Sequence, residues 1–176
     1  MDSAFGRGGQ LHAGDNLLGL PARRGQENMV KWLISHGANP DPVQTDHTDL
    51  TPLHEAVDNN HFAIATMLVQ AGANVNARHR WHAPEQTPLV IAISRRNALL
   101  VKVLLAAGAN PNLSDESLKF PQFPLAVALA THQPAIAWEL LRYRADPKQL
   151  SYVYHAKIHT GHAAQPIHFA ALSSNL

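Results

Sequence analysis

Cysteine is absent from this sequence of 176 residues. Its absence excludes a disulfide framework, a structural zinc site built on cysteine and catalysis by a thiol. Aromatic residues make up only 6% of the chain, although hydrophobic residues as a whole make up 45%. This balance is typical of thin helices packed through Leu, Ala, Val and Ile, and it argues against a large aromatic core.

Long apolar runs and an excess of charge of either sign are also missing. No apolar run reaches the roughly 18 residues that a membrane-spanning helix needs, so we expect no membrane insertion. The 14 Lys and Arg residues against 13 Asp and Glu leave a net charge of +1, so we expect no nucleic-acid partner. Residues 1–3 lack the charged leader and apolar segment of a secretory signal, and we expect a cytoplasmic location.

Catalytic signatures are missing as well. The sequence contains no G-x-S-x-G motif, no glycine-rich phosphate loop and no dinucleotide-binding fingerprint. The glycine-rich run at residues 6–9 precedes no strand–helix unit. We therefore expect that this segment is not an enzyme and that it uses no cofactor.

The sequence does contain a repeated unit, which is clearest at residues 51–76, TPLHEAVDNNHFAIATMLVQAGANVN. Thr51 is a good N-cap, and Pro52 fits the first position of a helix, where its missing N–H costs nothing. Apolar residues at helical spacing then mark two short helices on either side of residues 58–60. Gly72 suits the left-handed conformation that ends the second helix. The stretch predicts a helix, a turn, a second helix and a hairpin.

Two markers of this unit recur in phase along the chain. Pro88 and Pro124 follow Pro52 at successive intervals of 36 residues, and Pro166 comes 42 residues later. The helix endings HGANPD, AGANVN and AGANPN repeat 35 and 36 residues apart. This pattern resembles the ankyrin repeat, whose period is about 33 residues and whose T-P-L-H-x-A signature residues 51–56 match in full. We therefore predict an all-α ankyrin-repeat solenoid of four full helix-turn-helix repeats and a truncated fifth, with long β-hairpin finger loops.

The phase of the markers also predicts the domain limits. Residues 1–14 are rich in glycine and show no period, so we interpret them as a flexible leader. The ankyrin repeat domain is expected over residues 15–176, with repeats at about 15–47, 48–83, 84–119, 120–161 and 162–176. The last repeat has one helix only, which favours further repeats or another domain C-terminal to Leu176.

The first and fourth repeats depart from the pattern. Pro21 falls inside the first helix, where proline typically costs about 3 kcal/mol, so we expect that helix to be short. Arg144 replaces glycine at the end of the fourth outer helix, where a left-handed residue with a side chain is penalised by about 1 kcal/mol or more. The helices of the first repeat are marked by Leu17, Leu18 and Leu20 and by Met29, Val30, Leu33 and Ile34.

The resemblance to ankyrin repeats implies structural roles for five residues. In that family the histidine of T-P-L-H bonds the threonine hydroxyl and the backbone of the neighbouring repeat. Thr51 and His54 are therefore expected to tie the turn to the helix, and a role for His54 in catalysis or ligand binding is the weaker alternative. Gly37, Gly72 and Gly108 are expected to end the outer helices.

The insertions in the repeat point to a binding face. Spacings above 33 residues lengthen the fingers, and insertions on one face of a repeat stack often mark that face, although neutral drift remains an alternative. The second finger concentrates Arg and Trp, which are enriched at binding hot spots. The predicted partner-binding residues are Arg78, Arg80, Trp81, His82, Arg95, Glu55, Asp58, Tyr152 and Tyr154.

Alignment of the repeats predicts where charged and apolar residues lie around this face. We expect Arg95 and Arg96 to lie below the second finger on the same side, beside an acidic region in the second repeat. Such a polarised groove favours a partner with the complementary charge pattern. Positions equivalent to Glu55 are expected to form an apolar strip in the groove: Ile91, Val127 and Phe169.

Histidine is frequent, with 12 residues, and it leaves two alternatives open. His155, His159 and His162 form an H-x3-H-x2-H group that could ligate a transition metal, but no supporting carboxylate or second motif accompanies it, so we assign no metal site. A pH-sensitive contact is an alternative use of such residues. Separately, the sequence around Asn76 resembles the hairpin that asparaginyl hydroxylases modify in ankyrin repeats.

The resemblance predicts a protein-interaction module that binds a protein or peptide partner through its groove and fingers. The alternative is a regulatory or substrate-docking segment of a larger enzyme or effector whose catalytic domain lies outside this chain. The scaffold is shared by binders of unrelated targets, so the sequence gives no partner identity.

Overall fold

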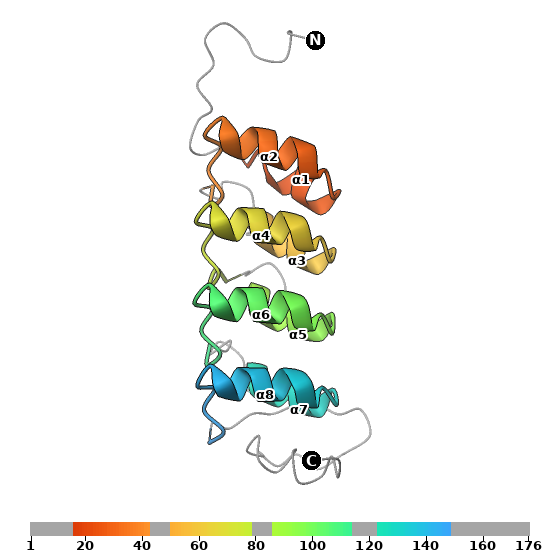
Figure 1. Cartoon of the computed structure of the whole chain (residues 1–176), viewed down its shortest axis with the longest axis vertical. Helices are drawn as coiled ribbons and strands as arrows, with labels where there is room; N and C mark the ends of the chain where they lie inside the picture. The colour runs from red at the N-terminus through yellow and green to blue at the C-terminus, as the bar shows by residue number, and fades with distance from the viewer. Residues whose placement is uncertain (1–15, 43–49, 79–85, 114–122, 149–176) are drawn as a thin grey trace, which may run out of the picture.

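Paired helices stacked in a row make up the fold (Figure 1). The computed structural model describes residues 16–42, 50–78, 86–113 and 123–148, and each of these four segments contributes two helices and no strand. The helices are α1 (Gly19–Arg23), α2 (Glu27–Ser35), α3 (Pro52–Asp58), α4 (Phe62–Gln70), α5 (Pro88–Ser94), α6 (Ala98–Ala106), α7 (Pro124–Ala130) and α8 (Pro134–Arg142).

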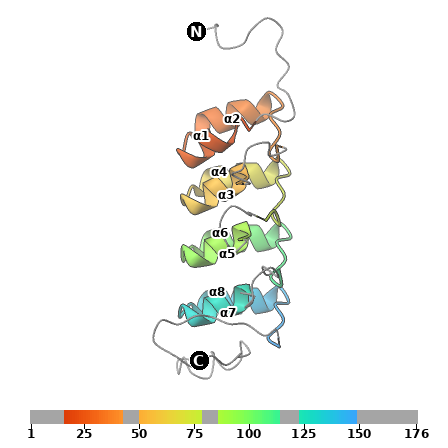
Figure 2. The ribbon, with the colours of Figure 1, turned by 180° about the vertical axis from the view of Figure 1, so that it is seen from behind.

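The helices form two layers. The inner helices α1, α3, α5 and α7 pack against one another in sequence, and the outer helices α2, α4, α6 and α8 do the same (Figures 1 and 2). Inner and outer helices meet at one edge of the stack, which we call the turn edge. The described residues that follow each outer helix lie at the opposite edge, which we call the finger edge (Figure 1). The predicted all-α solenoid is confirmed, and the predicted β-hairpins fall largely outside the described residues.

Local sequence explains where the inner helices begin. Thr51 and Thr87 adopt extended backbone, and their side chains accept the N–H of His54 and of Val90, respectively. A proline occupies the first turn of α3, α5 and α7. The predicted short first helix is also observed, because α1 has only 5 residues and Pro21 is its third.

Each repeat reverses direction twice through a residue with positive φ. One series follows the inner helices and the other follows the outer helices, and each recurs once in every described repeat. The first series is Gly25, Asn60, Arg96 and His132, and the second is Gly37, Gly72, Gly108 and Arg144. Because side chains penalise this conformation, glycine is the natural choice in three of the four outer-helix endings.

The outer-helix endings differ in residue type, with glycine in three repeats and Arg144 in the fourth. This difference predicts opposite effects for two substitutions. Gly108→Ala is expected to lower the free energy of unfolding by about 1 kcal/mol, because φ is 89° while the space around an added Cβ is open, so backbone strain is the only cost. Arg144→Gly is expected to raise it by about 0.5 kcal/mol, since the strain is relieved but glycine costs backbone entropy. Urea unfolding of both variants checks this. A change of the same sign in both would contradict it.

The core lies between the two layers and is continuous from the first described repeat to the fourth. In the first repeat Leu18, Val30 and Leu33 are buried, whereas Leu20 and Met29 are about half exposed. Met29 aligns with the fully buried Ile64, but within the described residues no helix precedes the first pair to cover it.

The expected apolar strip in the groove is wrong for two of its three positions. Ile91 and Val127 belong to the core and are 5% and 8% exposed, so neither offers an apolar surface to a partner. Neighbouring inner helices pack closely enough to cover both side chains. Phe169 lies outside the described residues.

Candidate functional site

A short polar motif follows each outer helix at the finger edge. In each repeat a side-chain oxygen accepts the backbone N–H of the residue two positions later, at 2.8–3.0 Å. This turn is a common use of Asn and Asp side chains. The accepting and donating pairs are Asn39 with Asp41, Asn74 with Asn76, Asn110 with Asn112, and Asp146 with Lys148.

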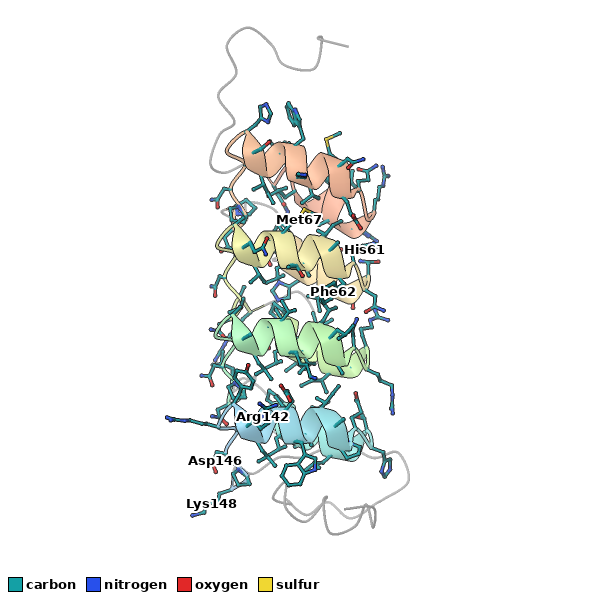
Figure 3. All side chains as sticks on the ribbon, viewed as in Figure 1. His61, Phe62, Met67, Arg142, Asp146 and Lys148 are labelled. Atoms are coloured by element: carbon teal, nitrogen blue, oxygen red, sulfur yellow. The ribbon has the colours of Figure 1, made fainter. Side chains whose placement is uncertain are left out.

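The third residue of each of the first three motifs links one repeat to the next. Asn76 accepts the N–H of Asn110 at 2.8 Å and donates its amide to the carbonyl of Gly108 at 3.2 Å. Asn112 does the same one repeat later, with Asp146 at 2.8 Å and with Arg144 at 3.0 Å. We call this chain of contacts the finger-base ladder. Asp146 and Lys148 lie at its far end on the finger edge (Figure 3).

A second set of contacts joins the repeats at the turn edge, where His61 lies (Figure 3). The ring Nε2 of His61 lies 3.2 Å from the carbonyl oxygen of Arg23. Asn97 and Gln133 occupy the same position in later repeats. They donate their amides to the side chain of Asn60 at 2.6 Å and to the carbonyl of Ile93 at 3.0 Å. Hydrogen bonds therefore join neighbouring repeats along both edges of the core. They hold the finger bases at one edge and the turns at the other at regular intervals.

Charged side chains pair across neighbouring inner helices. Arg95 donates from Nε and Nη2 to one oxygen of Asp58 at 3.0 and 2.8 Å, with both side chains about half exposed. Arg23 lies 3.9 Å from Glu55. Burial raises the pKa of Glu55 above its ordinary value, Arg23 lowers that pKa, and Asp58 raises it further. The acidic and basic regions predicted for the groove therefore partly neutralise each other.

The structure separates two of the predicted partner-binding residues. Arg78 is exposed and follows α4 at the start of the second finger, whereas Arg95 caps the C-terminal end of α5. Because α5 runs from the finger edge to the turn edge, these residues lie at opposite edges (Figure 1). Arg95 and Arg96 were expected on the same side as the second finger, but they lie at the edge opposite to its described start. Residues 79–85 of that finger lie outside the described residues. Arg80, Trp81, His82, Tyr152 and Tyr154 lie outside the described residues.

The side chain of His54 is hydrogen-bonded to Thr51 and to the next repeat. The His54 ring is fully buried, with Nδ1 2.9 Å from the Thr51 hydroxyl and 3.3 Å from the Thr51 backbone nitrogen. Its Nε2 lies 3.1 Å from the carbonyl oxygen of Gln86, in the next repeat. Since the Thr51 N–H donates to Nδ1, the proton of a neutral ring is on Nε2 and is donated to Gln86.

The linking residues of the ladder were not predicted from the sequence, although a signal for them exists. Asn or Asp stands two residues after each of Gly37, Gly72, Gly108 and Arg144, and Asn or Asp stands four residues after the three glycines. This spacing, in phase with the helix endings, would have indicated a hydrogen-bonded turn. The candidate metal group at His155, His159 and His162 lies outside the described residues.

Comparison with known families agrees with this architecture. A model described as "Ankyrin repeats (3 copies)" matches residues 5–79, and one described as "Ankyrin repeat" matches residues 85–116. The chain belongs to the ankyrin repeat family. Residues 123–148 lie beyond both matches, yet α7 and α8 continue this ankyrin stack with the same helix pairing. Among the described residues of the ankyrin chain, no helix is long and apolar enough to cross a membrane.

Curated relatives contain similar ankyrin segments within much longer proteins. The potassium channel GORK of Arabidopsis thaliana is 41% identical over 66 residues, which are 38% of this chain and 8% of the channel. The potassium channel SKOR of the same plant is 40% identical over 33% of this chain and 7% of the channel. GA-binding protein subunit beta-2 of Mus musculus is 39% identical over 32% of this chain and 13% of that protein. The matched part therefore spans a small fraction of each relative.

Proposed function

We propose that this ankyrin chain binds a protein or peptide partner through its inner-helix face and its long fingers. Ankyrin repeats are generally protein–protein interaction modules. One relative, GA-binding protein subunit beta-2, is a subunit by name, which is consistent with a role in assembly. No catalytic role is proposed for the described residues.

The observation that carries the proposal is the fixed base of the second finger. Asn76 donates its N–H to Asn74 and accepts the N–H of Asn110 in the next repeat, and Arg78, two residues later, is exposed. A finger that starts from a fixed base loses less conformational freedom on binding than one on a loose loop. The residues that follow include Arg80 and Trp81, types that commonly supply most of the energy of an interface.

Replacing the finger residues tests this proposal. A partner is first captured with the full chain and identified by mass spectrometry. Arg80→Ala and Trp81→Ala are each expected to weaken its binding by more than about 1 kcal/mol, or more than about fivefold in Kd, because hot-spot residues of these types carry such energies. The helical circular dichroism should not change. Titration calorimetry measures both affinities.

A matched control is available on the outer layer. Lys102 is exposed on α6, and Lys102→Ala is expected to leave the affinity unchanged. Unchanged affinity in both finger variants would remove the second finger from the interface. For Arg80→Ala, a loss of affinity equal to that of Lys102→Ala would have the same meaning, because both variants remove one positive charge.

A second candidate function has support from the relatives. In the two channels and in the GA-binding subunit the matched ankyrin segment is 7–13% of a longer protein. By analogy, this chain would serve as a regulatory or substrate-docking segment of a larger enzyme or effector. The reading frame of the parent gene discriminates between the candidates, because continuation into another fold favours docking and a stop codon after Leu176 favours a free-standing binder.

A further inference from the structure

The first joint of the finger-base ladder differs from the two that follow it. Asn76 and Asn112 each accept one hydrogen bond from the next repeat and donate one to it. Asp41 stands in their place in the first repeat. Its Oδ2 accepts the N–H of Asn74 at 2.6 Å, but its Oδ1 is buried and has no hydrogen-bond partner among the described residues. The first joint therefore lacks one of its two bonds.

The alignment of the ladder identifies the missing partner. Asn76 donates to the carbonyl of Gly108, two residues before the N–H that it accepts. Asn112 donates to the carbonyl of Arg144, again two residues before the accepted N–H. The same count from Asn74 leads to the carbonyl of Gly72. A carboxylate has no hydrogen to donate, so the alignment predicts that in the first joint one acceptor faces another.

We propose that the joint between the first and second repeats is completed by a proton, which the carboxyl of Asp41 takes up from solvent and donates to the carbonyl of Gly72. When Asp41 is charged, the joint keeps only its bond to Asn74. A buried acceptor without a donor is costly, so the charged joint is weaker than the two joints that follow. Repeats in such stacks are held by their nearest neighbours alone, so the first repeat separates more readily from the rest.

The electrostatic surroundings of Asp41 agree with this geometry. Burial raises the pKa of Asp41 above its ordinary value of 3.8, and the hydrogen bond from the Asn74 N–H lowers it by less. Neither influence comes from a charged side chain. Because the folded chain then holds the proton to a higher pH than the unfolded chain, the stabilisation is complete below about pH 3.8 and is lost as the pH rises through the folded value.

Among the described residues, Glu55 is the other carboxyl whose pKa is raised, and its effect on stability must be separated from that of Asp41. It faces Arg23 and Asp58 on the inner helices and has no part in the ladder. Substitution of Asp41 alone, compared with the unchanged chain at the same pH, cancels the contribution of Glu55, because distant sites contribute almost independently.

Asp41→Asn is the direct test, with thermal unfolding of the full chain as the readout. Asparagine supplies the missing donor at every pH, as Asn76 does in the next joint. At about pH 7 the variant is expected to melt about 2–4 °C above the unchanged chain. At about pH 3, below the ordinary pKa of 3.8, the difference is expected to fall below about half of that value, because the carboxyl of Asp41 is then mostly protonated.

Two further variants make the result specific. Asp146→Asn changes an acid to an amide in the same motif, but among the described residues the Asp146 side chain accepts only the N–H of Lys148. The melting temperature of this variant is therefore expected to stay within about 1 °C of the unchanged chain. Asn76→Asp installs the mismatch in the second joint and is expected to lower the melting temperature at about pH 7 more than at about pH 3. If Asn76→Asp does not fold, the comparison of Asp41→Asn with Asp146→Asn decides alone.

A direct titration completes the test. The carboxyl carbon of Asp41, followed by NMR, is expected to titrate above its ordinary value of 3.8. Three results would overturn the proposal: no gain in Asp41→Asn at about pH 7, a gain that is the same at both pH values, or a midpoint for Asp41 at or below 3.8.

Discussion

His54→Ala is expected to lower the free energy of unfolding by about 2–4 kcal/mol. The ring is fully buried and bonds Thr51 on one side and the carbonyl of Gln86 on the other. Its removal leaves that carbonyl and the Thr51 N–H without their partner, at about 1–3 kcal/mol for each buried group that water does not reach. The lost ring also leaves a cavity.

The measurement is urea unfolding of the full chain, followed by circular dichroism. His36→Ala is a matched control, because His36 is exposed and its ring contacts only Trp32 and Ser35 among the described residues, so a loss below about 1 kcal/mol is expected. Equal losses in the two variants would show that the buried contacts of His54 contribute little. In that case the role implied by the ankyrin signature would not hold for this chain.

Much of the fold could be predicted because its signals are local. A Thr-Pro pair at the start of a helix and a glycine at its end act within one turn of chain, and their recurrence at 36 residues fixes the phase of the repeat. Pro21 predicted a short first helix for the same reason, since its ring conflicts with its own preceding turn. The contacts of His54 came from the resemblance to ankyrin repeats and could not be derived from one sequence.

The candidate site was predicted less well because its contacts cross between repeats. Arg95 and Asp58 are 37 residues apart, and only the stacking of α5 on α3 brings them together. The sequence marked both as charged groove residues, but it could not tell that they pair with each other. Likewise, the side of the stack on which Arg95 lies depends on the direction of α5, which runs away from the finger edge.

The burial of the groove positions shows the same limit. In the alignment of the repeats, Ile91 and Val127 occupy the same position as Glu55, whose side chain is also mostly covered. Whether such a position is open to a partner depends on how closely the inner helices approach, and that distance is a property of the packed stack. Asp41 is a related case, because its missing bond becomes visible only beside the complete joints of Asn76 and Asn112.

Leu104→Ala is expected to cause the other large loss, about 2–5 kcal/mol of unfolding free energy. Leu104 is fully buried in α6, which packs against α4, α5 and α8, so the cavity opens in the middle of the described stack. Removal of a buried leucine costs the transfer energy of the lost atoms and the energy of the cavity, which neighbouring side chains fill only in part. Because each repeat is stable only through its neighbours, damage to the third repeat weakens its joints with the second and the fourth.

The same helix supplies a matched control for this prediction. Leu99 is 64% exposed in the first turn of α6, and Leu99→Ala is expected to change the stability by less than about 0.5 kcal/mol. Guanidinium unfolding monitored by circular dichroism measures both variants. In a single cooperative stack Leu104→Ala shifts the whole transition, whereas a stack whose repeats unfold independently would lose only part of its helical signal early. A shift in Leu104→Ala no larger than that in Leu99→Ala would contradict the continuous core between the two helical layers.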